Sequence, residues 1–455
     1  MSDQTIFALA TGAGPAGIAV FRVSGPGAGA ALLALAGEQL PSPRAATRRR
    51  LNLPGQDIPL DDALVLWFPA PASFTGEDMA ELHVHGGRAV IEAVAAALGG
   101  LPDLRPAEAG EFTRRAYENG KFDLAQAEAL ADLIAAESEA QRLQALDQLG
   151  GGLSARFEDW REQLIALLAH VEAAIDFADE EIPDDLLIPI NHKMLGIKDD
   201  LTQYLDDRHH GDRLRQGLQV TIVGAPNAGK SSLLNALARR EAAIVSETEG
   251  TTRDVIEVHI DLGGLPVILA DTAGLRSTED AIEAEGVRRA ESRASDAELR
   301  LCVFDATHWP DLDGPTRAQL GLGAICVLNK SDLVNTGALG ENHIVSDSQE
   351  KIPICLISAK TGAGLDHLLA GVEQALRDRI GKIGTTGVAP LTRARHRRAL
   401  EDAVSALDRA AATEMAPEVL AEELRLATRA LGRIAGRVDV EDVLDRVFAE
   451  FCIGK

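Results

Sequence analysis

Cysteine and aromatic residues are scarce in this sequence. Only 4 of its 455 residues are cysteine, and aromatic residues make up 4%. Cys302, Cys326 and Cys355 lie in short apolar runs, and the cysteine positions match neither a metal-site spacing nor a disulfide framework. We therefore expect these three thiols to be buried in strands of a protein from a reducing compartment.

Long apolar runs and net positive charge are also missing. No uninterrupted apolar run approaches the roughly 20 residues that span a bilayer, and the N-terminus lacks a basic segment followed by an apolar one. We predict a cytoplasmic protein with no membrane segment. The formal net charge of −25 argues against a general nucleic-acid coat, although arginines at residues 48–50 and 393–398 leave room for a local basic groove.

The pattern of the sequence changes along the chain. A length of 455 residues suggests about two to four domains. Short apolar segments at residues 17–23 and 63–68 predict strands in a mixed N-terminal region, with a helix over 88–98. Helical spacing dominates residues 124–179 and returns over 392–451.

Strands and helices alternate between residues 218 and 380, which is typical of a parallel sheet with crossover helices. Because helical sequence flanks this α/β segment on both sides, we favour its insertion into a helical domain; two separate helical regions are the alternative. The predicted fold class is multidomain α/β and α, with a strand-rich α+β N-terminal domain, a helical domain and an inserted Ras-like P-loop domain. The predicted segments are 1–118 (N-terminal), 119–215 and 381–455 (helical), and 216–380 (inserted).

The strongest motif, residues 224–231, matches the pattern G-x-x-x-x-G-K-S. An apolar strand precedes it and a helix follows, which is the context of a phosphate-binding loop. Its backbone N–H groups and the helix N-terminus favour an anion. We expect Lys230 to reach the β- and γ-phosphates and Ser231 to bind Mg²⁺.

Two further motifs predict the rest of a nucleotide site. The sequence Asp271-Thr272-Ala273-Gly274 follows an apolar run, where a carboxylate can hold Mg²⁺ through water and the Gly274 N–H can contact the γ-phosphate. In Asn329-Lys330-Ser331-Asp332, the Asp332 carboxylate can accept hydrogen bonds from the N–H and amino groups of guanine. Adenine lacks that donor pair, so the motif favours GTP over ATP.

The sequence Ser358-Ala359-Lys360 supplies backbone contact to the guanine oxygen. The order and spacing of these elements predict a GTPase. Residues 250–254 lie where a switch loop belongs, and a threonine hydroxyl there can complete the Mg²⁺ shell. Sequence order alone leaves Thr251 and Thr252 as equal candidates.

The water-orienting glutamine of Ras-like enzymes is absent, because Leu275 stands at that position. Glu279, Asp280, Glu283 and Glu285 follow as polar candidates. The amide of Asn227 could coordinate a monovalent cation, which would supply the positive charge that an arginine finger supplies elsewhere.

Several of these motifs, together with others outside the α/β segment, resemble one family. They are residues 226–235, 250–254, 271–276, 74–78, 85–87, 119–128 and the terminal Cys452-Ile453-Gly454-Lys455. The chain resembles the MnmE (TrmE) family of tRNA-modifying GTPases over essentially its whole length. The C-I-G-K ending and the N-G-K-x-D-L-A-Q-A-E segment are the most specific features.

The resemblance implies an N-terminal domain that binds a tetrahydrofolate one-carbon donor and forms a homodimer. It implies a partner, the FAD- and NADH-dependent MnmG (GidA), in a heterotetramer. Together they would build an aminomethyl or carboxymethylaminomethyl group on C5 of the wobble uridine of certain tRNAs. The G domains would pair in the GTP state with K⁺ bound, and hydrolysis would drive the conformational cycle.

The resemblance also implies roles for individual residues. Thr252 becomes the second Mg²⁺ ligand beside Ser231, and Glu283 becomes the group that orients water. The implied K⁺ ligands are Asn227, Ser246, Thr248 and Thr251. Ser246 replaces a more familiar threonine, and the family uses a main-chain carbonyl at the position of Thr248. The full GTP site is Asn227, Ala228, Gly229, Lys230, Ser231, Ser232, Ser246, Glu247, Thr248, Glu249, Gly250, Thr251, Thr252, Asp271, Thr272, Ala273, Gly274, Asn329, Lys330, Asp332, Ser358, Ala359 and Lys360.

The implied folate site comprises Arg22, Glu81, Lys121 and Lys455. A pterin offers a donor edge to Glu81, and its glutamyl tail carries carboxylates that attract Arg and Lys. Cys452 would act near the modification chemistry, or would serve a conformational or packing role. Two rival functions are a ribosome-assembly or regulatory GTPase without modification activity, and a folate-dependent one-carbon enzyme with an accessory G domain.

Overall fold

The computed structural model describes residues 4–12, 14–37, 39–176, 187–206, 210–240, 257–271, 297–334, 343–345, 351–380, 390–411, 416–438, 444, 447–449, 451 and 454. The chain divides into two compact units. One comprises Met1–Ala131, Gln148–Asp199 and Ala399–Lys455, and the other comprises Asp132–Asp147 and Asp200–Arg398. The four segments predicted from the sequence remain a prediction.

The first unit contains a six-stranded sheet with the strand order β3-β4-β5-β2-β1-β6. Only β1 and β6 pair in parallel. The strands are β1 (Thr5–Leu9), β2 (Ala16–Ser24), β3 (Thr47–Asn52), β4 (Pro59–Phe68), β5 (Met79–Gly86) and β6 (Leu104–Pro106), and the helices on the sheet are α1 (Ala28–Ala36) and α2 (Arg88–Gly99). The strands predicted over residues 17–23 and 63–68 and the helix over 88–98 are confirmed.

Strands β2 and β5 each have one apolar and one polar face. Phe21 and Val23 of β2 and Leu82 of β5 are buried in the core that α1 and α2 share with the sheet. Because side chains alternate along a strand, Arg22 and Glu81 lie on the opposite face, where they are register partners. The alternation explains why a charged residue interrupts an otherwise apolar strand.

Helix α3 (Glu111–Glu118) carries a buried ionic network. The Glu111 carboxylate accepts hydrogen bonds from Arg105 and Arg115 at 2.6 and 2.9 Å, and Arg115 also contacts Glu77 at 3.1 Å. Burial acts to raise the pKa of Glu111, but hydrogen bonds from Arg105, from the Glu108 backbone and from Arg115 outweigh it and lower the pKa. The paired charges stabilise this region only as long as the carboxylate is ionised.

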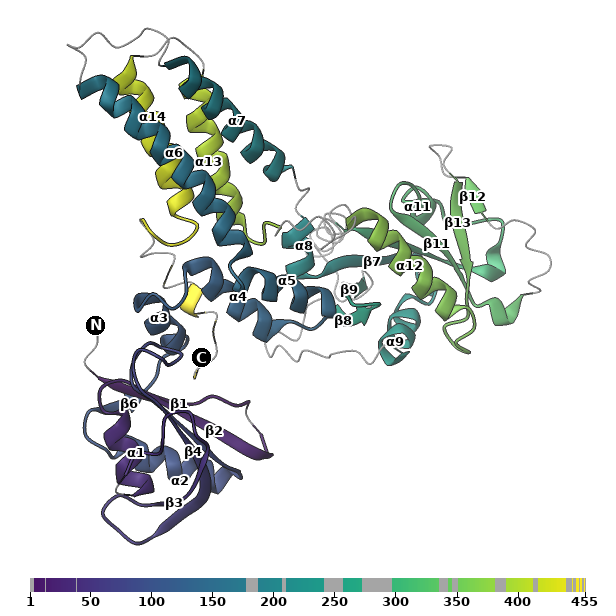
Figure 1. Cartoon of the computed structure of the whole chain (residues 1–455). Coiled ribbons are helices and arrows are strands. Elements are labelled where there is room, and N and C mark those ends of the chain that lie inside the picture. Colours follow the sequence, from purple (N-terminus) through teal and green to yellow (C-terminus); the bar gives the residue numbers. More distant parts are fainter. Residues whose placement is uncertain are drawn as a thin grey trace, which may run out of the picture. The chain divides into compact units, whose positions relative to one another are not determined.

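Helices from distant parts of the chain lie side by side in a bundle, as α6, α7, α13 and α14 show in Figure 1. Buried residues recur every three or four positions in α6, as in Leu153, Phe157, Trp160 and Leu164, which is the apolar stripe that helix packing requires. The helices are α4 (Leu124–Ala135), α5 (Glu139–Leu149), α6 (Gly152–Asp176), α7 (Leu187–Leu205), α8 (His210–Gln216), α13 (Ala394–Ala411) and α14 (Pro417–Gly432). The predicted helical patterns are confirmed in α4, α5 and α6 for the first region, and in α13 and α14 for the second. No helix in the described part of the chain is long and apolar enough to cross a membrane.

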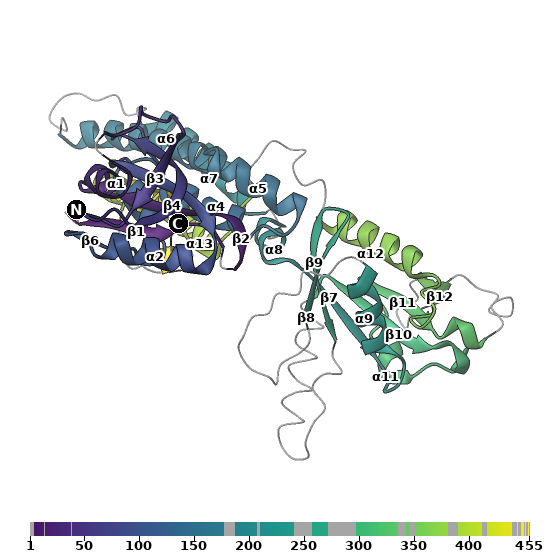
Figure 2. The same ribbon diagram turned by 90° about the horizontal axis from the view of Figure 1, so that it is seen from below.

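The second unit is built on a seven-stranded sheet with the order β12-β13-β11-β10-β7-β9-β8. The five strands from β13 to β9 are parallel, and the edge strands β12 and β8 are antiparallel to their neighbours. The strands are β7 (Leu218–Gly224), β8 (Glu257–Leu262), β9 (Leu265–Asp271), β10 (Leu299–Asp305), β11 (Ala324–Asn329), β12 (His343–Val345) and β13 (Lys351–Leu356). Figure 2 shows this sheet from another side, with α9 (Lys230–Arg240) and α12 (Leu365–Ile380) alongside it.

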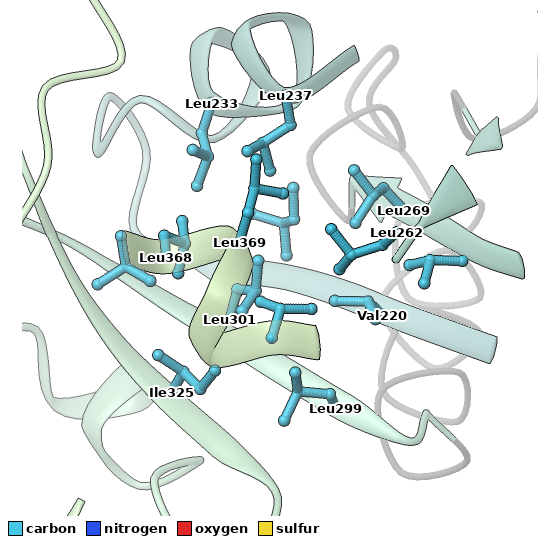
Figure 3. Close-up of a cluster of buried hydrophobic side chains, with 14 of the residues drawn as sticks. Val220, Leu233, Leu237, Leu262, Leu269, Leu299, Leu301, Ile325, Leu368 and Leu369 are labelled. Carbon is cyan, nitrogen blue, oxygen red and sulfur yellow. The ribbon is translucent and has the colours of Figure 1, made fainter. Parts of the chain in front are cut away.

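The core of the second unit explains its continuous apolar strands. Leucines of α9 and α12 meet Val220, Leu301 and other strand residues on one face of the sheet (Figure 3). Cys302 and Cys326 are buried in a second cluster, whose residues alternate along β10 and β11 with those of the first cluster. Strands buried on both faces are uniformly apolar. The predicted burial of Cys302, Cys326 and Cys355 in strands is confirmed, and burial raises the pKa of the first two thiols to about 12.

Helix α5 adds to the second unit a segment that the sequence assigns to the helical domain. The Ala140 N–H donates to the Gly264 carbonyl in the β8–β9 turn at 3.0 Å. Gln141 donates to the Arg215 carbonyl at 3.1 Å, and His259 of β8 lies 3.1 Å from the Glu137 carboxylate. These contacts explain why Asp132–Asp147 belong to this unit.

Candidate nucleotide-binding site

The predicted phosphate-binding loop connects β7 to α9. Strand β7 ends at Gly224 and α9 begins at Lys230, so the loop leads into a helix N-terminus as predicted. Asn227 and Gly229 have φ angles of 64° and 94°. A Cβ atom on Gly229 would collide with Nδ2 of Asn329, so both the backbone conformation and the space favour glycine.

Lys230 lies within this loop. Its side chain is buried, and its ammonium donates to the carbonyls of Gly224 and Ala225 at 2.8 and 2.9 Å. The positive charge therefore lies at the backbone that the motif predicts to surround phosphate. Ser231 follows in the first turn of α9, where its hydroxyl is an oxygen donor of the kind that Mg²⁺ prefers.

Asn329 connects the phosphate loop to the predicted guanine loop. It ends β11 and is buried. Its Nδ2 donates to the Ala228 carbonyl at 3.0 Å, and its Oδ1 accepts from the Ala359 N–H at 3.0 Å. One amide thus fixes two loops that lie more than a hundred positions apart in the sequence.

Asp332 is exposed and held by one strong contact. The Ser358 hydroxyl donates to its Oδ1 at 2.6 Å. That hydrogen bond is the main cause that lowers the pKa of Asp332. The carboxylate is therefore ionised at neutral pH and oriented, as an acceptor for the guanine N–H and amino groups must be.

These loops enclose a cavity of about 510 Å³. From the predicted set it brings together Gly229, Ser232, Asn329, Lys330, Asp332, Ser358, Ala359 and Lys360. Sequence reasoning missed four lining residues, namely Asn235, Ala236, Arg239 and Leu333. Helical spacing could have identified two of them, because Asn235 and Arg239 follow Ser232 by three and seven residues and so lie on the same helix face.

A second cavity, of about 400 Å³, borders the same loop. Residues 225–228 line it together with Phe304, Asp305, His308, Asp311, Leu312 and Asp313. Asn227 therefore borders this second cavity, whereas Gly229 borders the first.

Other predicted residues lie outside the described part of the chain. They are Ser246, Glu247, Thr248, Glu249, Gly250, Thr251, Thr252, Thr272, Ala273, Gly274, Glu283, Cys452 and Lys455. For Asp271, the structure describes the backbone, which ends β9 beside Ile222 of β7. The carboxyl end of β9 thus lies next to the strand that leads into the phosphate loop.

A second polar cluster lies on the face of the N-terminal sheet opposite α1 and α2. Arg22 donates to Glu81 at 3.0 Å, and His83 lies 3.2 Å from the same carboxylate. The Arg22 guanidinium also lies over the Phe74 ring, 5.4 Å from its centroid. The structure therefore brings together Arg22 and Glu81 of the predicted folate set, and adds His83 and Phe74, which the sequence analysis did not select.

Of the remaining folate residues, the structure describes Lys121, and it describes Gly454, the residue before Lys455. Lys121 is exposed and donates to the Pro71 carbonyl at 2.8 Å, next to Phe122, whose ring lies 5.5 Å from that of Phe74. Gly454 has a φ of 100°, and a Cβ there would collide with the Leu9 carbonyl at the end of β1. The C-terminal segment thus contacts the N-terminal sheet at a position that favours glycine.

The arginines of residues 393–398 do not form the open basic groove that the sequence allowed. Arg393 donates to Asp132 at 2.8 Å, and Arg397 donates to the Leu205 carbonyl at 2.8 Å. Only Arg398 of this group is exposed. These side chains satisfy partly buried acceptors within the second unit, where carboxylates and carbonyls need donors.

Comparison with known proteins extends the assignment to the whole chain. A family model for the MnmE helical domain matches residues 124–452, and one for the GTP-binding protein TrmE N-terminus matches residues 5–121. The tRNA modification GTPase MnmE of Paramagnetospirillum magneticum is 56% identical over 454 residues, covering 100% of both chains. The chain belongs to the MnmE family of tRNA modification GTPases. The MnmE protein of Rhodospirillum rubrum is also similar, with 54% identity over 468 residues and 100% coverage of both.

Membership in the MnmE family makes this chain a GTPase, in agreement with its phosphate and guanine loops. The resemblance and the multidomain fold class predicted from the sequence are confirmed. Among solved structures, the G domain of the T. maritima FeoB iron transporter is 22% identical, covers 35% of this chain and 98% of its own, and has a TM-score of 0.25. A GTP-binding protein from Sulfolobus solfataricus with GDP is 17% identical, covers 48% and 67%, and has a TM-score of 0.26. These low scores add nothing to the family assignment.

Proposed function

We propose that this chain is a K⁺-stimulated GTPase that modifies tRNA together with an FAD-dependent partner of the MnmG (GidA) type. The pair adds an aminomethyl or carboxymethylaminomethyl group to C5 of the wobble uridine, with a one-carbon unit from tetrahydrofolate. The observation that carries the proposal is the full-length similarity to MnmE proteins, combined with a guanine loop and a phosphate loop linked through Asn329. We further propose the predicted domain boundaries, a homodimer within a heterotetramer, and a cytoplasmic location.

The donor atoms of the phosphate loop fit the proposed cations. Mg²⁺ and K⁺ both prefer oxygen ligands, and the loop offers the Ser231 hydroxyl and the Asn227 amide. Asn227 is exposed at the rim of the loop, so its amide oxygen is available to a cation. We propose Ser231 with Thr252 for Mg²⁺, and Asn227 with Ser246, Thr248 and Thr251 for K⁺. Bound cations neutralise charge that develops on the phosphates.

The residues of the second unit have separate tasks in hydrolysis. Lys230 neutralises phosphate charge from within the loop, and Asp332 with Ser358 selects guanine over adenine. Asp271, Thr272, Ala273 and Gly274 form the loop that responds to the γ-phosphate. Because Leu275 cannot polarise water, we propose that Glu283 orients the attacking water.

The N-terminal cluster supports the folate part of the proposal. Glu81 offers acceptors to a pterin, Arg22 and Lys121 offer cations to carboxylates, and Phe74 offers a ring face. Gly454, the residue before Lys455, contacts the same sheet. We propose Lys455 as the fourth folate residue and Cys452 as a group close to the modification chemistry.

The charge distribution favours a partner as the main source of basic surface for tRNA. The net charge is −25, and Arg393 and Arg397 serve internal contacts. Tight tRNA binding requires cations that replace counterions at phosphates. We therefore expect weak tRNA binding by this chain alone.

The first test is steady-state GTP hydrolysis by the purified chain in KCl and in NaCl, with Glu283→Ala beside the wild type. We expect strong stimulation by K⁺ that the variant loses. Equal rates in both salts would overturn the cation assignment, and an undiminished variant would overturn the role of Glu283. A deletion strain with normal amounts of modified wobble uridine would overturn the tRNA function.

A further inference from the structure

Asp305 lies beside the nucleotide cavity and contacts a residue that lines it. It is the last residue of β10, and its register partner on β11 is Asn329. Because the two strands are parallel neighbours, their carboxyl ends meet at one edge of the sheet. The Lys330 ammonium, one residue beyond Asn329, donates to Oδ2 of Asp305 at 2.6 Å.

Both oxygens of Asp305 have partners, so its carboxylate is fixed. Oδ1 accepts from the N–H and the hydroxyl of Thr307 at 3.0 and 2.7 Å, which caps the short helix Ala306–His308. Burial acts to raise the pKa of Asp305, but hydrogen bonds from Lys330 and Thr307 outweigh it and lower the pKa to about 2. The carboxylate is therefore charged at neutral pH.

Lys330 depends on this contact for its direction. Its backbone has a φ of 65°, and Lys330 lines the 510 Å³ cavity together with Asp332. Asp305 lines the neighbouring 400 Å³ cavity instead. Because the ammonium is held by Asp305, the part of the side chain left to border the space that Asp332 assigns to the guanine ring is the apolar stem.

We propose that Asp305 is a positioning residue for guanine nucleotides, which acts only through Lys330. With its ammonium held by Asp305, the flexible lysine stem is already ordered before the base enters. Nucleotide binding therefore does not have to pay the conformational entropy of ordering the Lys330 side chain. The role differs from that of Asp332, which contacts the base edge directly.

The test is a double-mutant cycle on the full chain, with GDP affinity as the readout. Asp305→Asn removes the charge but keeps the shape and an oxygen acceptor for Thr307. We expect it to weaken GDP binding about three- to tenfold, the cost of ordering one long side chain. In a Lys330→Gln background, the same change should have no further effect, because the group through which Asp305 acts is gone.

Thr307→Val is the matched control. It removes one hydrogen bond from the same carboxylate, leaves the Lys330 contact in place, and should leave GDP affinity unchanged. If Asp305→Asn weakens GDP binding equally in both backgrounds, Asp305 has a general structural role and the proposal fails. Unchanged affinity in the single variant also overturns it. If Asp305→Asn lowers the unfolding temperature too far for binding assays, Asp305→Ser goes through the same cycle with the same expectation.

Discussion

A single methyl group at Gly229 should disrupt both nucleotide loops. In Gly229→Ala, the new Cβ would collide with Nδ2 of Asn329, and the backbone would keep a φ of 94° that alanine disfavours. Asn329 would have to move, and it is buried with hydrogen bonds to the Ala228 carbonyl and the Ala359 N–H. The perturbation therefore spreads from the phosphate loop to the guanine loop.

The size of the effect follows from these contacts. The left-handed backbone costs alanine about 1 kcal/mol, and each displaced hydrogen bond of Asn329 costs about 1 kcal/mol. The variant can relax when nucleotide is absent, but binding requires both loops in their original positions. The sum of about 3 kcal/mol corresponds to a GDP affinity roughly 100-fold lower.

The assay is GDP binding to the full chain by fluorescence titration, with unfolding temperature measured beside it. Gly55→Ala is the control, because Gly55 also has a positive φ of 72° but has no atom within 4 Å of its Cβ position. The control should bind GDP like the wild type. If Gly229→Ala stays within about threefold of wild-type affinity, then the contact between the two loops does not govern binding and the reasoning is wrong.

Two further predictions concern carboxylates with lowered pKa values. In Ser358→Ala, the pKa of Asp332 should rise toward its ordinary value, because the Ser358 hydrogen bond is the main cause of the lowering. The Asp332 carboxylate binds guanine only when it is ionised, so as the pH falls the variant should lose GDP affinity at a higher pH than the wild type. Coinciding profiles of GDP affinity against pH would contradict this. Glu111→Gln should destabilise the first unit by about 2–4 kcal/mol, because it removes the charge between two arginines. The wild type should lose this advantage as the pH falls through the lowered pKa of Glu111. In acid, its melting temperature should therefore approach that of the variant. The exposed control Glu92→Gln should melt like the wild type at every pH.

The sequence alone determined the elements whose chemistry is local. A phosphate loop uses the backbone of consecutive residues between one strand and one helix, so residues 224–231 predict β7, the loop and α9 together. The apolar runs of β10 and β11 likewise predict buried strands, because strands covered on both faces have no polar alternation. The guanine loop was found for the same reason, since Asp332 and its neighbours form one short motif.

Only the tertiary structure decided which distant residues meet. The contact of Lys330 with Asp305 depends on the parallel register of β10 and β11, and no spacing in the sequence encodes it. The same holds for Arg393, which the sequence allowed as open basic surface and which instead pairs with Asp132. Gly454 contacts β1 from the opposite end of the chain. Short-range patterns fix elements and motifs, whereas pairings across hundreds of positions depend on how the elements pack.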